Sequence, residues 1–120
     1  MKISFDYDDT LSLHKIQEIA KSLIKSGHDV WIITTRNNEY GTYNHDMFYV
    51  AQNVGISLTN IIFTDGTLKA QYYKKCNFEM HFDNDWEEIE AINIVGGLGI
   101  LVTDDMGDVF GEMQKRFNDD

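Results

Sequence analysis

Short apolar runs alternate with amphipathic stretches from one end of the chain to the other. Apolar residues at positions 16, 19, 20, 23 and 24 share one face of a helix, and Gly27 stands where such a helix would end. The run 30–33 is apolar throughout and rich in β-branched residues, which is typical of a strand buried on both faces. Similar short runs predict further strands at 3–5, 61–63, 80–82 and 99–102. The polar stretch 36–46 predicts a loop, and apolar periodicity predicts further helices at 47–54, 69–75, 86–92 and 109–117.

This alternation of strands and helices with short connections indicates a parallel sheet with right-handed crossovers. Five such units in 120 residues leave no room for a second domain. We therefore expect an α/β fold, a single three-layer α/β/α, Rossmann-like domain over residues 1–120 with a five-stranded parallel sheet. Ligands of such open sheets bind beyond the carboxyl ends of the strands, so functional residues should follow directly after the apolar runs.

Polar residues that can carry chemistry do stand at these positions. They are Asp6, Asp8, Asp9 and Thr10 after the first run, Thr34, Thr35 and Arg36 after the second, Lys69 after the third, and Asp83, Asn84 and Asp85 after the fourth. Carboxylates that converge repel one another unless a cation lies among them, and hard oxygen ligands suit Mg²⁺. A lysine and a threonine hydroxyl can hold phosphoryl oxygens, and an aspartate can attack phosphorus once a cation offsets the charge. The pattern predicts phosphoryl transfer.

The segment Asp6-Tyr7-Asp8-Asp9-Thr10 resembles the first motif of the haloacid dehalogenase (HAD) superfamily, Asp-x-Asp-x-Thr/Val. Thr34, Lys69 and Asp83 resemble its second, third and fourth motifs, in family order and over nearly the whole chain. The resemblance implies a HAD-like catalytic core that hydrolyses phosphomonoesters with Mg²⁺ through an aspartyl-phosphate. The chain looks most like the small uncapped phosphatases, so we expect no cap domain and a small phosphorylated metabolite or nucleotide as substrate.

The resemblance also implies a role for each residue that matches a motif. Asp6 would be the nucleophile, and Asp8 would be the general acid for the leaving oxygen and then the base for water. Thr34 and Lys69 would contact the phosphoryl group, with Thr35 and Arg36 as further substrate contacts. Mg²⁺ would be bound by Asp6, the backbone carbonyl of Asp8, and Asp83. The family often has two adjacent acids in the fourth motif, whereas Asn84 follows Asp83 here, so either Asn84 or Asp85 completes the metal site.

Several alternatives remain at this stage. Thr35 competes with Thr34 for the phosphoryl contact, and Lys74 and Lys75 compete with Lys69. The polar loop offers Asn37, Tyr40, Tyr43 and His45 as further substrate contacts. A receiver-like signalling domain, with Asp65 as phospho-acceptor, has a similar length and a similar set of acids. A non-catalytic phosphate- or metal-binding module is the third possibility.

Charge and composition narrow the classes of partner. The chain has 10 Lys plus Arg against 20 Asp plus Glu, a net charge of −10, which disfavours general binding to nucleic acid or anionic membranes. We attribute most of this excess to solubilising surface, including Glu87, Glu88 and Glu90. The single cysteine excludes an internal disulfide, and no leader-like or membrane-spanning run is present. We expect a soluble, cytoplasmic protein, and the sequence leaves its oligomeric state open.

Overall fold

The structure is a computed structural model that describes residues 1–39 and 43–103. Its five strands are β1 (Lys2–Phe5), β2 (Asp29–Thr34), β3 (Ile61–Phe63), β4 (Met80–Asp83) and β5 (Gly99–Leu101). All neighbouring strands pair in parallel, and their order across the sheet is β3-β2-β1-β4-β5. The predicted five-stranded parallel sheet is therefore confirmed. The helix expected at 109–117 lies outside the described residues.

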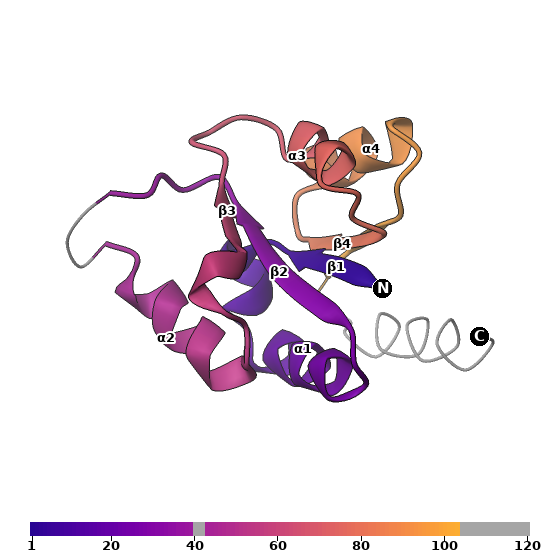
Figure 1. Ribbon diagram of the computed structural model, residues 1–120. Helices are drawn as coiled ribbons and strands as arrows, with labels where there is room; N and C mark the ends of the chain where they lie inside the picture. Colours follow the sequence, from indigo (N-terminus) through magenta and orange to yellow (C-terminus); the bar gives the residue numbers. More distant parts are fainter. Residues whose placement is uncertain (40–42, 104–120) are drawn as a thin grey trace.

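Helices cover both faces of this sheet. They are α1 (His14–Lys25), α2 (His45–Val54), α3 (Ala70–Lys75) and α4 (Trp86–Ile94), with the single turns η1 (Tyr7–Leu11) and η2 (Leu58–Asn60) between elements. The first two helices lie on one face of the sheet, and α3 and α4 lie on the other (Figure 1). The predicted three-layer α/β/α arrangement is thus confirmed.

The central strands β1, β2 and β4 are largely buried because side chains of the sheet meet helices on both faces. The main core joins the inner faces of α1 and α2 to β1, β2 and β4. At its centre the rings of Phe5 and Phe82 stack with centroids 4.5 Å apart, and both residues are fully buried. A smaller core on the other face packs Ile33 against Tyr73 and Ile92 from α3 and α4. This burial holds the middle strands in a fixed register.

That register sets the position of the candidate site. Phe5 of β1 is paired with Phe82 of β4, so the residues that follow, Asp6 and Asp83, lie side by side at the carboxyl edge. The amide of Asp6 donates to the carbonyl of Phe82 at 2.8 Å, which extends the pairing by one residue. The chain moves outward from β1 to β2 and β3 and then crosses to β4 on the other side of β1. This reversal of strand order is where open α/β sheets form their ligand crevice.

The strand order also separates this fold from that of a receiver domain. Receivers have the order 2-1-3-4-5, in which the third strand is central. Here β1 is central and β3 is at the edge. The segment after β3, which contains Asp65, therefore does not occupy the central position that a receiver gives its acceptor.

Among residues 1–39 and 43–103, none of the helices combines the length and the apolar character needed to cross a bilayer.

Candidate active site

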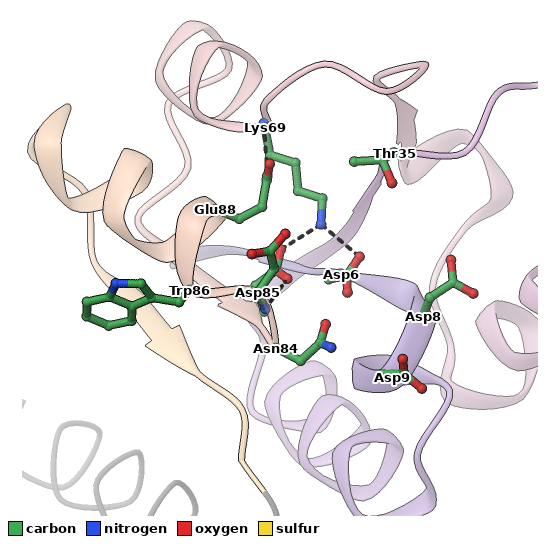
Figure 2. A pocket seen from close by; sticks show the side chains of 10 residues that line it. Asp6, Asp8, Asp9, Thr35, Lys69, Asn84, Asp85, Trp86 and Glu88 are labelled. Atoms are coloured by element: carbon green, nitrogen blue, oxygen red, sulfur yellow. Dashed lines mark hydrogen bonds and ion pairs between the residues drawn. The ribbon is translucent and has the colours of Figure 1, made fainter.

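A pocket of about 450 Å³ opens at the carboxyl ends of β1 and β4 (Figure 2). Its lining includes Asp6 and Asp8 after β1, Thr35 after β2, and Asp83 at the end of β4. Six of the ten lining residues carry a carboxylate. Such a pocket is strongly electronegative unless cations offset the charge.

Lys69 is the cation at the floor of the pocket. Its ammonium group lies 2.7 Å from Asp6 Oδ1 and 2.6 Å from Asp83 Oδ2, and all three side chains are buried (Figure 2). Burial alone would lower the pKa of Lys69, but the charges of Asp6 and Asp83 more than offset this and raise it. Lys69 therefore stays charged and joins the two strand ends. Its rivals Lys74 and Lys75 are exposed in the last turn of α3.

The two carboxyl groups bound to Lys69 differ in their surroundings. Burial raises the pKa of Asp6 from its ordinary value of 3.8 to about 7, with Lys69 acting in the opposite direction. Burial also acts on Asp83, but the hydrogen bond to His81 and the charge of Lys69 outweigh it and lower its pKa. Asp83 is thus the ionised partner of Lys69, and Asp6 is easily protonated when no other cation is near.

A buried relay fixes the orientation of Asp83. His81 Nε2 lies 2.8 Å from Asp83 Oδ2, and His81 Nδ1 lies 2.7 Å from the hydroxyl of Ser4. Burial lowers the pKa of His81, so the ring is neutral at pH 7 and its Nε2–H donates to Asp83. The other oxygen of Asp83 accepts from the backbone N–H of Asp85 at 3.0 Å. Both oxygens of Asp83 therefore already accept hydrogen bonds from the protein.

Glu88 corrects one expectation from the sequence. The sequence predicts that Glu88 belongs to the solubilising surface, but it is only 5% exposed and lines the pocket. Its Oε2 accepts from the backbone N–H of Lys69 at 3.0 Å, which ties the start of α3 to α4. Burial raises the pKa of Glu88. Its role in the fold is to fix the backbone from which the Lys69 side chain extends.

The turn after β1 brings several oxygen atoms close to Asp6. Asp9 takes a left-handed conformation with φ of 57°, and the chain returns so that Leu11 N–H donates to the Asp6 carbonyl at 3.1 Å. The hydroxyl of Thr10 lies 3.3 Å from both Asp6 Oδ2 and Asn84 Oδ1. Thr10 therefore links the turn after β1 to the residues that follow β4.

Asn84 faces the same oxygen atoms. One end of its amide lies 3.0 Å from Asp6 Oδ2 and 3.3 Å from the carbonyl oxygen of Asp8. If the amide nitrogen occupies this end, it donates to both oxygens; if the amide oxygen does, three oxygens face one another, which a cation stabilises. Within the described parts of the chain, no three His, Cys, Asp or Glu side chains are grouped as a metal-binding set. A cation at this place would therefore need the amide and carbonyl oxygens as well as Asp6.

The residues after β2 divide between two environments. Thr34 is fully buried outside the pocket lining, and its hydroxyl accepts from the Arg36 N–H at 3.2 Å. Thr35 is exposed and lines the pocket, so the structure brings Thr35 rather than Thr34 to the acids. The Arg36 guanidinium forms ion pairs with Asp8 and Asp46 and does not belong to the pocket lining. Of the other loop candidates, Tyr40 lies outside the described residues.

The raised pKa of Asp6 predicts how stability changes with pH in the metal-free protein. Between about pH 4 and pH 7 folded Asp6 keeps a proton that the unfolded chain has released, so its contribution to the free energy of unfolding falls as pH rises. His81 has a lowered pKa and acts in the opposite direction below its ordinary value of 6.5. We therefore expect wild type to lose stability relative to Asp6→Asn between pH 5 and pH 8. Urea unfolding of both proteins in buffers that contain a chelator measures the free energy of unfolding at each pH. Equal changes with pH in the two proteins would contradict the prediction.

Comparisons with known proteins support the fold. No protein-family model matches the chain, and a search of curated proteins finds no significant match. An uncharacterised protein from Corynebacterium glutamicum superposes with a TM-score of 0.64 at 14% identity, over 94% of this chain and 92% of the other. A hypothetical protein from Xanthomonas campestris gives 0.53 at 18% identity, over 83% of this chain and 62% of the other. At these identities the similarity shows a shared Rossmann-like α/β fold.

A third structure gives a weaker match. It is a protein from Vibrio cholerae named as a candidate 3-deoxy-D-manno-octulosonate 8-phosphate phosphatase. Its TM-score is 0.49 at 20% identity, over 75% of this chain and 60% of the other.

Proposed function

We propose that the protein is a Mg²⁺-dependent phosphomonoester hydrolase with Asp6 as its nucleophile. The observation that carries this proposal is the placement of the two oxygens of Asp6. Oδ1 accepts from the Lys69 ammonium at 2.7 Å, and Oδ2 faces Asn84 and Thr10. A nucleophile for phosphorus needs neighbouring cations that neutralise an incoming phosphoryl group. The Asp6 carboxylate has the Lys69 ammonium beside Oδ1, and the cluster of polar groups beside Oδ2 suits a second cation.

Asp6 Oδ2, the Asp8 carbonyl and Asn84 Oδ1 are the residues that would hold Mg²⁺. One end of the Asn84 amide lies 3.0 Å from Asp6 Oδ2 and 3.3 Å from the Asp8 carbonyl. With its oxygen turned to this end, the three are hard oxygen ligands around one point, as a shared cation requires. The sequence predicts Asp83 as a ligand of Mg²⁺. We propose instead that it is the buried counter-ion of Lys69, since both of its oxygens accept hydrogen bonds from protein groups. Asp85 caps α4 by accepting from the Glu87 N–H, which favours Asn84 over Asp85.

Bound Mg²⁺ would lower the pKa of Asp6 and offset the charge of the phosphoryl group. Asp6 then forms a bond to phosphorus as the bond from phosphorus to the leaving oxygen breaks, and Asp8 gives that oxygen a proton. In the second half, ionised Asp8 takes a proton from water, whose oxygen attacks phosphorus and displaces Asp6 as phosphate departs. Lys69 and Thr35 border the pocket where the phosphoryl oxygens would lie.

The pocket volume of about 450 Å³ is within the range of small-ligand sites. We propose that residues 1–120 form an uncapped catalytic core, because short segments join β1 to α1 and β2 to α2. The substrate class is then a small phosphorylated metabolite or nucleotide. Trp86 borders one end of the pocket and is 60% exposed, and its indole ring points away from Asp6 and Lys69 (Figure 2).

The test is turnover of p-nitrophenyl phosphate by the purified protein. We expect hydrolysis with added Mg²⁺, loss of activity with a chelator, and recovery when Mg²⁺ is restored. A denatured sample is the control for contaminating metal-catalysed hydrolysis. Stable labelling of Asp65 by acetyl phosphate, without ester turnover, would instead support a receiver-like acceptor. Mg²⁺ binding without turnover of any phosphomonoester would support a binding module.

A further inference from the structure

Arg36 is held on several sides next to the turn after β1 that carries Asp8. Its Nε and one terminal nitrogen donate to the two oxygens of Asp8 at 3.0 and 2.7 Å. Its terminal nitrogens also donate to the two oxygens of Asp46 at 2.8 and 3.0 Å. The guanidinium carbon lies 5.0 Å from the ring centroid of Tyr7 and 5.4 Å from that of Tyr43. This side chain therefore has one fixed position and connects the start of α2 to the loop that carries Asp8.

We propose that Arg36 is a positioning residue, which orients the Asp8 carboxylate for proton transfer and is itself held in place by Asp46. This inference deepens the proposed hydrolase function and rests on it. Arg36 lies on Asp8 rather than in the pocket lining, so its position fits an action through Asp8 better than direct contact with phosphate.

The geometry of the pair suits this role. Two parallel hydrogen bonds from a guanidinium fix the plane of a carboxylate, whereas a lysine would act only as a point charge. A carboxylate accepts about four hydrogen bonds, so the two from Arg36 leave lone pairs that can carry the proton given to the leaving oxygen or accept one from water. The Asp8 side chain is 56% exposed at the pocket, where few other contacts would restrict it. Without Arg36, Asp8 would sample several orientations, and proton transfer requires a narrow range of them.

Asp46 gives Arg36 its second anchor. It lies in the first turn of α2, where the helix dipole favours a carboxylate. The hydrogen bonds from Arg36 lower the pKa of Asp46, and those from Asp46 and Asp8 raise the pKa of Arg36, so the pair stays charged around neutral pH. Asp46 does not line the pocket and was absent from the residues that the sequence singled out.

The test compares two substrates that differ in their need for a general acid. p-Nitrophenolate leaves readily without a proton, whereas the alkoxide of an alkyl phosphate such as ethyl phosphate does not. Because kcat/KM reports the steps up to release of the leaving group, we measure it for both esters with Mg²⁺. For Arg36→Gln we expect about a 30-fold loss on ethyl phosphate and less than about a 3-fold loss on p-nitrophenyl phosphate. Asp8→Asn should give the same selectivity with a larger loss.

Further variants separate orientation from charge and from folding. Arg36→Lys keeps the charge but cannot form two parallel hydrogen bonds, so it should still lose kcat/KM selectively on ethyl phosphate. Asp46→Asn should show a weaker form of the same selective loss while the protein stays fully folded. Lys21→Gln removes one charge from the exposed pair with Glu18 and should leave both rates unchanged. Equal losses on the two esters in Arg36→Gln and Asp46→Asn, or full recovery in Arg36→Lys, would overturn the positioning role while leaving the hydrolase intact. No turnover of either ester by wild type would overturn the hydrolase and this inference together.

Discussion

Asp6→Asn is expected to lower kcat/KM for p-nitrophenyl phosphate by about 10⁴-fold or more while leaving the protein folded. An amide has nearly the same shape as the carboxyl group but cannot form the acyl phosphate. Because burial raises the pKa of Asp6 to about 7, the wild-type carboxylate is costly to hold ionised at pH 8. We therefore expect Asp6→Asn to be at least as stable as wild type at pH 8 without metal. Such a combination is typical of a residue retained for catalysis at a cost in stability.

Asp9→Asn is the matched control for this variant. Asp9 is an exposed acid in the same turn, and asparagine accepts its left-handed conformation as readily as aspartate does. Asp9 lines the pocket but supplies none of the proposed ligand or catalytic atoms, so we expect its kcat/KM to stay within about 3-fold of wild type. Mass spectrometry after a rapid acid quench should find a phosphoryl adduct on Asp6 in wild type and none in Asp6→Asn. Near-normal turnover by Asp6→Asn would show that the nucleophile is another group.

The sheet could be predicted from the sequence because its central strands are buried on both faces. The run 30–33 is typical of a buried strand and lies within β2, and the left-handed Gly55 follows α2 where the pattern predicts the helix end. The group of residues at the carboxyl edge could be predicted as well, since a parallel sheet brings together the residues that directly follow its strands. Asp6, Lys69 and Asp83 do meet there, and the Lys69 ammonium lies within 2.7 Å of an oxygen of each acid.

Contacts between residues that lie far apart in the sequence could not be predicted. Glu88 follows Glu87 in an acidic stretch and gives no sign that it turns inward to the Lys69 amide. Which of Thr34 and Thr35 faces the pocket depends on where β2 ends and how the chain turns, which the composition of the strand does not fix. Likewise, Arg36 and Asp46 are ten residues apart across a polar loop, so helix periodicity does not link them. The sequence thus supplied the residue types, and the register supplied their pairing.

Lys69→Met is expected to destabilise the protein and to inactivate it. Removing the ammonium leaves Asp83, which is fully buried, without its cation, and breaking a buried ion pair in this way costs about 3–5 kcal/mol. The cost should come from unpaired carboxyl groups rather than from lost packing, since methionine fills nearly the same volume. The double variant Lys69→Met/Asp83→Asn should therefore recover part of the lost stability, although not the activity. Urea unfolding at pH 7 with a chelator measures each free energy.

Lys74→Met provides the matched control, because Lys74 is exposed on the neighbouring helix α3 and should change stability by less than about 0.5 kcal/mol. Mg²⁺ adds a second readout. The proposed ligands lie around Asp6 Oδ2, whereas Lys69 binds Oδ1, so Lys69→Met should still be stabilised by Mg²⁺. With one cation missing from an electronegative pocket, that stabilisation should exceed the wild-type value. If Mg²⁺ stabilised wild type but not Lys69→Met, the metal would depend on the lysine, and the assignment of the two cations to opposite oxygens of Asp6 would be wrong.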